Sequence, residues 1–204
     1  MNNCFIILAG GESKRFNSKI PKPYHLYKGK PLLLHSIDKA KSYNKFHKIV
    51  LVINKKHKNF IKKFKISGVK IIEGGKTRAE SAYKGLKSIK NYKIKKVMIH
   101  DAARPNFSLK LLDKLNEQLK FNDCVIPAIQ SMDSVKQKLS NKIINLNRKN
   151  IYLIQTPQAF NYKRLYKLQS NKNIEVTDDA NLFVNAGKKI KIIKGEINNN
   201  KITI

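Results

Sequence analysis

Short runs of consecutive apolar residues recur along the chain, separated by segments with apolar residues at helical spacing. Phe5–Leu8 is one such run, ended by glycine, and Lys48–Ile53 is a second. Runs of this kind are typical of strands buried on both faces of a sheet. Further runs that predict strands lie at residues 69–72, 95–100, 124–128 and 189–193.

Between these runs, helical spacing of apolar residues predicts an amphipathic helix at Leu32–Ala40. A Lys-rich helix containing Phe60, Ile61 and Phe64 is predicted next, and another from Ser108 to about Phe121. Strands that alternate with helices favour a three-layer α/β domain with a mostly parallel sheet. In such folds the ligand binds at the carboxyl ends of the strands.

Two further helix starts carry capping signals. Thr77 with Glu80 three residues later has the pattern of a capping box. Thr177 is predicted to cap another helix, because Asp178 and Asp179 after it would be stabilised by the helix dipole.

The hydrophobic pattern changes between residues 130 and 153. Val135, Leu139, Ile143, Ile144 and Leu146 are interleaved with polar residues, around a turn at residues 140–142. This pattern predicts a two-stranded hairpin with no helix to cover it, so we expect a projecting arm that needs a partner, which suggests a homodimer. No linker interrupts the rest, and we expect a single domain, residues 1–204, with 130–153 as its dimerisation arm.

The chain is strongly basic. Lys and Arg number 43 against 13 Asp and Glu, which gives a formal charge of +30. Such a charge attracts polyanions, and a basic nucleic-acid-binding protein is therefore one reading of the chain. The cations are dispersed along the whole sequence and no aromatic stacking motif accompanies them. A general compositional bias explains the charge better, and we expect no specific nucleic-acid partner.

Cysteine usage and hydropathy bear on the compartment. Cys4 and Cys124 lie beside apolar runs, far apart and without a C-x-x-C pattern, which predicts buried reduced thiols. No apolar stretch is long enough to span a bilayer, and the amino terminus lacks the pattern of a signal peptide. We therefore expect a soluble cytoplasmic protein with no membrane partner.

Candidate chemistry begins directly after the first strand. Gly10 and Gly11 allow a sharp turn with bare N–H groups, and Ser13, Lys14 and Arg15 add a hydroxyl and two cations. This arrangement suggests a phosphate-binding loop, although it matches neither the P-loop nor the G-x-G-x-x-G pattern, and an ordinary strand-to-loop glycine pair stays open as the alternative.

Two more polar segments follow predicted strands. One runs from Gly74 to Ser81 and includes Arg78; two glycines, Arg78 and Ser81 exceed what a helix start needs, which favours a ligand loop. The other contains Asp101 and Arg104. These two could form a simple ion pair, or Asp101 could bind a ribose hydroxyl or a metal ion while Arg104 binds a phosphate.

Taken in order, these motifs resemble those of the 2-C-methyl-D-erythritol 4-phosphate cytidylyltransferases. The resemblance covers nearly the whole chain, and its most specific parts are the Asp-Ala-Ala-Arg-Pro and Thr-Pro-Gln stretches. The motifs that carry it are Leu8-Ala9-Gly10-Gly11 with Arg15, Pro21-Lys22, Gly74-Gly75 with Arg78 and Ser81, His100 to Pro105, Gln155 to Gln158, and Thr177-Asp178.

The resemblance implies a Rossmann-like nucleotidyltransferase fold. It also implies transfer of a cytidylyl group from CTP to 2-C-methyl-D-erythritol 4-phosphate, with release of pyrophosphate, in non-mevalonate isoprenoid synthesis. Mg²⁺ is the implied cofactor, held mainly by CTP phosphates, and no protein metal ligand is assigned. Catalytic roles fall on Arg15, Lys22 and Lys201, CTP binding on Ala9, Gly10, Gly11, Gly75 and Ser81, and binding of the polyol phosphate on Asp101, Arg104, Ser134, Arg148, Thr156 and Thr177.

Some features depart from the family pattern or leave alternatives open. Pro23 stands where Gln usually follows the catalytic Lys, and Ser134 stands where Thr is usual. The family normally continues beyond Lys201 into a terminal helix, and some members carry a cyclodiphosphate synthase domain downstream, so the chain could be part of a longer protein. A cytidylyltransferase for another polyol phosphate, such as ribitol 5-phosphate, remains the nearest alternative. In the family the arm reaches the neighbouring subunit's site, which assigns Ser134 and Arg148 to the partner.

Overall fold

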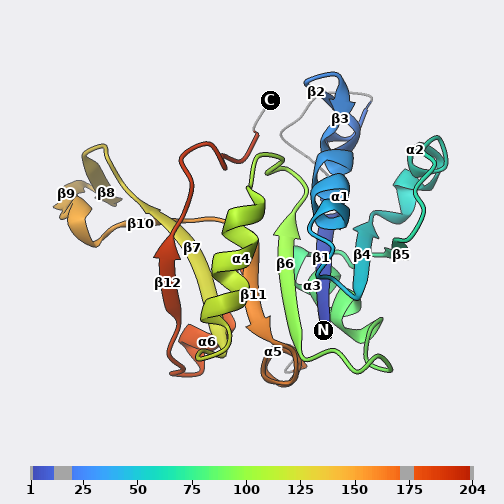
Figure 1. Cartoon of the computed structure of the whole chain (residues 1–204). Coiled ribbons are helices and arrows are strands. Elements are labelled where there is room, and N and C mark those ends of the chain that lie inside the picture. The colour runs from blue at the N-terminus through green and yellow to red at the C-terminus, as the bar shows by residue number, and fades with distance from the viewer. Residues whose placement is uncertain (1, 12–19, 171–176, 203–204) are drawn as a thin grey trace.

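The computed structural model describes residues 2–11, 20–170 and 177–202. A central sheet runs through the molecule, and within the described residues its strands follow the order β10-β7-β11-β6-β1-β4-β5, with β12 beside β7 (Figure 1). All neighbouring pairs are parallel except those of β10 and β11. The strands are β1 (Asn3–Ala9), β4 (Lys48–Ile53), β5 (Lys70–Glu73), β6 (Lys96–Asp101), β7 (Cys124–Gln130), β10 (Tyr152–Ile154), β11 (Gln158–Asn161) and β12 (Lys191–Lys194).

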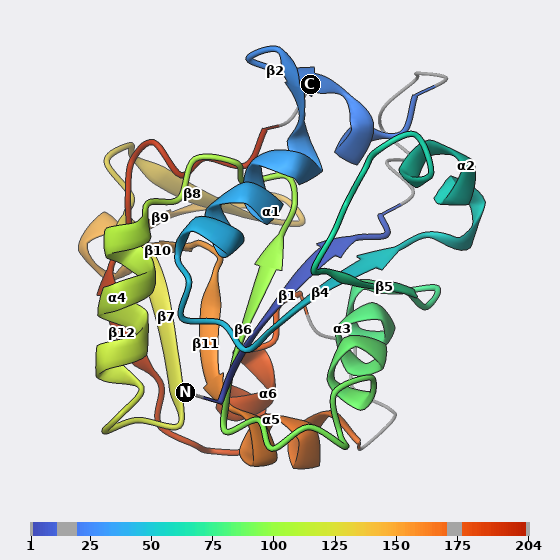
Figure 2. The same cartoon turned by 45° about the vertical axis from the view of Figure 1, so that its right-hand side comes forward.

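Helices cover both faces of this sheet, as Figures 1 and 2 show from two directions. The predicted three-layer α/β fold with a mostly parallel sheet is therefore confirmed. The helices are α1 (Leu32–Ser42), α2 (Lys58–Ile61), α3 (Arg78–Lys87), α4 (Leu109–Gln118), α5 (Tyr162–Gln169) and α6 (Asn181–Asn185).

The alternation of side chains along β1 explains the two helix layers. Phe5 and Ile7 point into a core shared with α1 and α4. Cys4 and Ile6 point into a second core, shared with α3, α5 and α6. Since β1 is buried along its whole length, both faces of the strand must be apolar, as the continuous run in the sequence indicates.

The strand register places the ends of β1, β4 and β6 together. Ala9 pairs with Ile53, and Leu8 pairs with Asp101. The three strands are parallel, so the loops that follow Ala9, Ile53 and Asp101 emerge at the same edge of the sheet. The loop after β5 reaches this edge as well, because Glu73 pairs with Ile53.

Two of the predicted helix details differ in the structure. The Lys-rich helix is shorter than expected: α2 covers four residues, after a 3-10 turn at Lys55–His57. Thr177 does not cap a helix; α6 begins at Asn181, whose N–H donates to Asp178 Oδ1, and Thr177 Oγ1 accepts from the Asn181 side chain. The local signal was correct for a turn, but the helix begins later, where Leu182 and Phe183 can enter the core.

The predicted hairpin arm is confirmed. β8 (Val135–Leu139) and β9 (Lys142–Leu146) pair only with each other among the described strands, and Figure 1 shows them projecting from the body. Ser140 in the connecting turn has a φ of 43°, the left-handed conformation that such tight turns require. Ile143 is 68% exposed, so the arm leaves apolar surface uncovered. A short pair, β2 (Leu26–Tyr27) with β3 (Lys30–Pro31), precedes α1.

The two cysteines are buried and unbonded, as expected. No helix within the described ranges is long and apolar enough to cross a membrane.

Candidate active site

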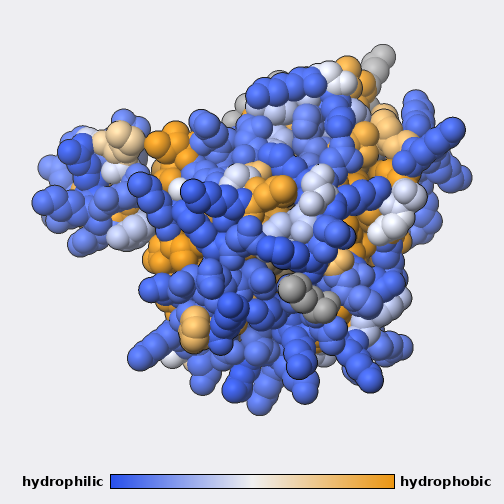
Figure 3. Space-filling model, viewed as in Figure 1, coloured by the Kyte–Doolittle hydropathy of each residue, from blue (hydrophilic) through white to orange (hydrophobic). Residues whose placement is uncertain are grey.

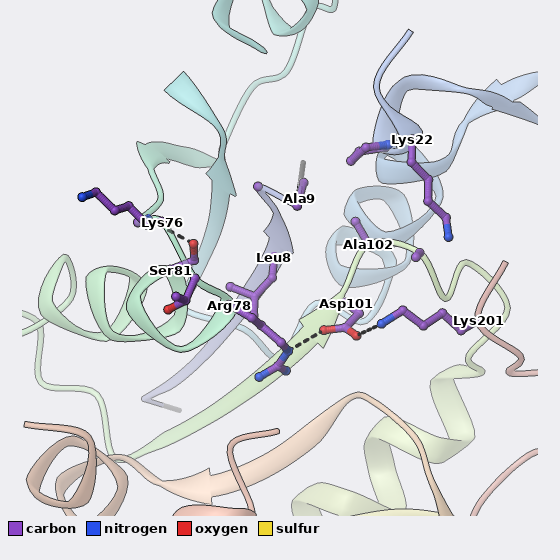
Figure 4. Close-up of a pocket in the computed structure, with 15 residues that line it drawn as sticks. Leu8, Ala9, Lys22, Lys76, Arg78, Ser81, Asp101, Ala102 and Lys201 are labelled. Carbon is purple, nitrogen blue, oxygen red and sulfur yellow. Dashed lines mark hydrogen bonds and ion pairs between the residues drawn. The ribbon is translucent and has the colours of Figure 1, made fainter. Parts of the chain in front are cut away.

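A cavity of about 460 Å³ opens at the carboxyl edge of the sheet, where the loops after β1, β5 and β6 meet (Figure 4). Most of the residues that the motifs had indicated lie in its wall. The lining comprises Leu8, Ala9, Gly10, Gly11, Lys22, Pro23, Gly75, Lys76, Thr77, Arg78, Ser81, Asp101, Ala102, Ala103 and Lys201.

The first wall is the glycine loop that follows β1. Asn54, at the end of β4, donates from its side chain to the carbonyl of Gly10 at 3.3 Å and so ties this loop to the next strand. Gly11 has open space where a Cβ would lie, so a bound molecule can approach its backbone. Arg15, predicted to hold phosphate from this loop, lies outside the described residues.

The second wall is the loop from Gly74 to Ser81. The N–H of Gly75 donates to Ser81 Oγ at 3.0 Å, and the N–H of Lys76 donates to Glu80 Oε2 at 2.7 Å. A Cβ on Gly75 would lie 2.3 Å from the Glu80 Cβ, so only glycine fits there. Thr77 caps α3 as predicted, since its Oγ1 accepts from the Glu80 N–H. A full capping box would also have the Glu80 carboxylate accept from the Thr77 N–H. The carboxylate accepts from the Lys76 N–H instead, so this part of the prediction was wrong.

The third wall carries a carboxylate between two cations. Asp101 Oδ1 accepts from Arg78 Nε at 3.1 Å, and Asp101 Oδ2 accepts from Lys201 Nζ at 2.9 Å (Figure 4). Burial would raise the pKa of Asp101, but the charges of Arg78 and Lys201 outweigh it and hold that pKa well below its ordinary value. Asp101 is therefore an ionised acceptor throughout the neutral pH range.

Behind this carboxylate lies a buried pair that fixes the backbone. Thr156 Oγ1 accepts the N–H of Asp101 at 3.1 Å and lies 3.1 Å from His100 Nδ1. His100 Nε2 lies 3.1 Å from the carbonyl of Arg104. A neutral ring with its proton on Nε2 satisfies all three contacts, and burial lowers the pKa of His100 to about 3. Thr156 thus supports Asp101 from outside the cavity.

Arg104 holds the carboxyl-terminal segment against the site. Its Nη1 donates to the carbonyl of Asn199 at 2.9 Å, and its Nη2 donates to the carbonyl of Ile154 at 3.2 Å. The N–H of Ile202 donates to the carbonyl of Ala103 at 2.8 Å. These contacts bring Lys201 to Asp101, although the two residues are 100 positions apart in the sequence.

Lys22 enters the cavity from a 3-10 turn, Lys22–Tyr24. Tyr24 anchors this turn: it is buried, and its ring centroid lies 5.2 Å from that of Phe60. Pro23, the departure from the family pattern, also lines the cavity, where it holds the turn without closing the pocket.

Five of the described candidates do not line this cavity. Arg104 and Thr156 lie behind Asp101, and Thr177 lies near the start of α6. Ser134 and Arg148 flank the arm hairpin, where Arg148 Nη1 donates to the carbonyl of Met132 at 2.8 Å. Roles for these residues in substrate binding stay predictions.

Sequence reasoning noted Arg78 in its loop but gave it no role, and it missed the partner Asp179. Arg78 Nη1 donates to Asp179 Oδ2 at 2.8 Å, and the Asp179 side chain is fully buried. For Arg78, the two glycines that shortly precede it were a usable signal. Nothing in the local sequence links it to a carboxylate 101 positions away.

A mostly parallel α/β sheet with two glycine loops and converging cations at its carboxyl edge is typical of a nucleotidyltransferase type of domain. A sequence model of the family described as "2-C-methyl-D-erythritol 4-phosphate cytidylyltransferase" matches residues 3–204. The chain belongs to this family.

Relatives of known name are similar over the whole chain. The bifunctional enzyme IspD/IspF of Pelagibacter ubique is 77% identical over 204 residues, which are 100% of this chain and 55% of the relative. The 2-C-methyl-D-erythritol 4-phosphate cytidylyltransferase of Fusobacterium nucleatum is 37% identical over 215 residues, with 98% of this chain and 91% of the relative covered. The chain thus spans about half the length of the bifunctional relative.

Solved structures agree with the fold. The 4-diphosphocytidyl-2C-methyl-D-erythritol synthase of Anaerococcus prevotii superposes with a TM-score of 0.87 at 31% identity, covering 99% of this chain and 92% of the other. The bifunctional IspDF of Campylobacter jejuni gives a TM-score of 0.86 at 37% identity, covering 100% of this chain and 52% of the other.

Proposed function

We propose that this chain transfers the cytidylyl group of CTP to 2-C-methyl-D-erythritol 4-phosphate, giving 4-diphosphocytidyl-2-C-methyl-D-erythritol and pyrophosphate in non-mevalonate isoprenoid synthesis. The supporting observation is a single cavity that joins the two glycine loops to the Asp101–Lys201 pair. Family membership supports the same substrates. Ribitol 5-phosphate is the acceptor that the alternative reading predicts.

The cavity is suited to hold the base and the triphosphate along one wall. Backbone groups of Ala9, Gly10 and Gly75 line the cavity together with Ser81, whose Oγ accepts the Gly75 N–H, and we assign this wall to the small polar edge of cytosine. The predicted phosphate loop supplies the Gly11 N–H and the Arg15 cation for the triphosphate, and Lys22 adds a second cation from its own turn.

The reaction needs positioning and charge stabilisation. A phosphate oxygen of the polyol substrate attacks the α-phosphorus of CTP, a new P–O bond forms, and the bond to the β-phosphate oxygen breaks, releasing pyrophosphate. No covalent enzyme intermediate is required. Lys22 and Lys201 supply positive charge where negative charge develops on the α-phosphate, and Asp101 accepts hydrogen bonds from hydroxyl groups of the polyol.

Mg²⁺ fits this site as an ion carried by the nucleotide. Arg78 and Lys201 already pair with the Asp101 carboxylate, and their charges disfavour a further cation beside it. When bound to the CTP phosphates, Mg²⁺ would neutralise charge on the leaving pyrophosphate.

The assembly we propose is a cytoplasmic homodimer of one nucleotidyltransferase domain, with residues 130–153 as the arm. Uncovered apolar side chains on the arm and at its base support this: Met132 is 80% exposed, Ile143 68% and Leu153 52%. Figure 3 shows hydrophobic residues where the arm meets the body, as well as others in the middle and on the opposite side of this face. In the dimer, Ser134 and Arg148 would serve the partner's site.

Pyrophosphate release tests the proposal. The protein is given CTP and Mg²⁺ with methylerythritol phosphate, ribitol phosphate or glycerol phosphate in separate reactions. We expect turnover with the first that exceeds the others at least tenfold in kcat/KM. Turnover with none of them, or a preference for ribitol phosphate, would contradict the proposed acceptor.

A further inference from the structure

Arg78 lies between two carboxylates, Asp101 in the cavity and Asp179 in the core, and the sequence motifs assign it no role. It is the first residue of α3, directly after the loop that carries Gly75, and its side chain is 25% exposed. One edge of its guanidinium contacts Asp101 through Nε, and Nη1 contacts Asp179. Figure 4 shows its side chain reaching across the floor of the cavity towards Asp101.

Asp179 fixes the guanidinium from behind. Its Oδ2 accepts from Arg78, and its Oδ1 accepts from Gln169 Nε2 at 3.2 Å, at the end of α5. Burial raises the pKa of Asp179, and only the adjacent Arg78 charge opposes this effect strongly. Burying an unpaired carboxylate costs much free energy, so a fully buried carboxylate needs a paired cation. Asp179 and Arg78 therefore fix each other's position.

We propose that Arg78 is a positioning residue: anchored by Asp179, it fixes the Asp101 carboxylate in the orientation that accepts hydroxyl groups of the polyol substrate. A carboxylate has about four acceptor positions. Arg78 takes one on Oδ1 and Lys201 takes one on Oδ2, which leaves the remaining positions for a ligand in the cavity that Asp101 lines. The inference rests on the proposed function and assigns no contact between Arg78 and substrate.

Charge gives this role a measurable signature. The charged and titratable groups around Asp101 are Arg78 from α3, Lys201 from the carboxyl-terminal segment, His100 and Arg104 from its own strand and loop, and Asp179 on the other side of Arg78. Arg78 is the strongest of the charges that keep Asp101 ionised. Without that charge, burial regains influence and the carboxyl should protonate at a higher pH.

The first test is independent of catalysis. Aspartate labelled with ¹³C at the carboxyl carbon is incorporated into wild-type protein, Arg78→Gln and Arg78→Lys, and the seven aspartates are followed by NMR against pH. Asp101→Asn assigns the signal. We expect the Asp101 midpoint to rise by about one pH unit or more in Arg78→Gln and to stay near the wild-type position in Arg78→Lys. An unchanged midpoint in Arg78→Gln would overturn the proposal.

The second test separates positioning from general stability. Arg78→Gln should raise the KM for the polyol phosphate about tenfold or more while CTP affinity, by calorimetry, changes less than about threefold. Arg164→Gln is the matched control, because Arg164 is 67% exposed and pairs with Asp123 away from the cavity. Equal losses of polyol and CTP binding would show a scaffold role and overturn the proposal.

A double-mutant cycle shows whether Arg78 acts through Asp101. In an Asp101→Asn background, Arg78→Gln should have little further effect on the polyol KM. Should Arg78→Gln fail to fold, Asp179→Asn replaces it: the shape is kept, the anchoring charge is lost, and the polyol KM should rise severalfold. Additive effects in the cycle, or a wild-type polyol KM in Asp179→Asn, would contradict the inference. If wild-type protein turns over no polyol phosphate, the proposed function fails, and the NMR titration still decides the coupling.

Discussion

At the scale of single residues, the carboxylate of Asp101 forms ion pairs with cations from two distant parts of the chain. Arg78 Nε lies 3.1 Å from Oδ1, and Lys201 Nζ lies 2.9 Å from Oδ2. Lys22 lies in the same cavity, on a separate turn. We therefore expect the two lysines to reach the α-phosphate from different segments, Lys201 from beside Asp101 and Lys22 from the turn Lys22–Tyr24.

Replacing Lys22 separates chemistry from binding. Lys22→Ala should lower kcat roughly a hundredfold or more, the scale for one preorganised charge at a transition state. CTP affinity should fall less, because the glycine loop and Mg²⁺ still hold the triphosphate. Steady-state kinetics with calorimetry would measure both; abolished CTP binding with a near wild-type kcat would make Lys22 a docking residue.

The buried His100 predicts a pH-dependent stability. Its pKa is about 3 in the folded protein and about 6.5 when exposed, so the unfolded chain takes up the proton first as pH falls. The stabilisation is complete above about pH 6.5 and is lost as pH falls towards 3. Between pH 7 and pH 5 this residue alone should cost roughly 2 kcal/mol of unfolding free energy.

Urea unfolding at pH 7 and pH 5 measures this dependence. His100→Asn removes the titrating ring and keeps an acceptor for Thr156, so its unfolding free energy should change less between the two pH values than that of wild type. His35→Asn is the control, since His35 is only partly buried and bonds Tyr27 at the surface. Equal pH dependence in His100→Asn and wild type would contradict the role of His100.

At the scale of elements, the sequence was most informative where one property decides the structure. β4 has the predicted bounds Lys48–Ile53, because a continuous apolar run is required for a strand buried on both faces. The helix predicted from Ser108 is confirmed as α4, and Ser108 caps it, with its Oγ accepting the Leu111 N–H. The prediction of a helix that begins at Thr177 was wrong, because burial of Leu182 and Phe183 decides where α6 begins.

The same distinction holds for the site, where local contacts could be predicted from the sequence and long-range contacts could not. Gly75 and Ser81 could be predicted, because their loop is local and their contact spans six residues. The pair of Arg78 with Asp179 could not, since it forms only after α3 and the segment before α6 pack on the same face of the sheet. Local patterns carry no information on which buried charges meet across 101 positions.

Gly75→Ala tests the predicted nucleotide loop. The new Cβ would meet Glu80 Cβ at 2.3 Å, so the loop must move away from the first turn of α3. We expect the KM for CTP to rise about tenfold or more, with a smaller change in the polyol KM. Lys87→Ala, at the exposed end of the same helix, is the control; a wild-type KM for CTP in Gly75→Ala would remove this loop from the nucleotide site.

At the scale of the whole molecule, the arm is the part that the rest of the described fold does not explain. β8 and β9 pair with each other, and their apolar side chains stay exposed. A second copy that covers them would also bring Arg148 to the partner's cavity. The dispersed charge of +30 has no structural counterpart among the described contacts that we can identify.

Mixed dimers test whether each active site takes Arg148 from the partner chain. Lys22→Ala and Arg148→Ala chains, each nearly inactive alone, are co-expressed and pair at random. Half the dimers are then mixed, each with one intact and one doubly damaged site, so roughly a quarter of wild-type activity should return. No recovery, with mixed dimers confirmed by native mass spectrometry, would show that each chain uses its own Arg148.

The central claim is cytidylyl transfer to one polyol phosphate, and a competition reaction tests it most directly. Wild-type protein receives CTP and GTP in equal amounts, with equal methylerythritol phosphate and ribitol phosphate, and mass spectrometry counts the four possible products at early times. The product ratios equal ratios of kcat/KM, and tenfold selectivity requires only about 1.4 kcal/mol of differential transition-state binding. We expect the product of CTP and methylerythritol phosphate to exceed every other product at least tenfold. Equal use of CTP and GTP, or a dominant ribitol product, would show that the proposed reaction is wrong.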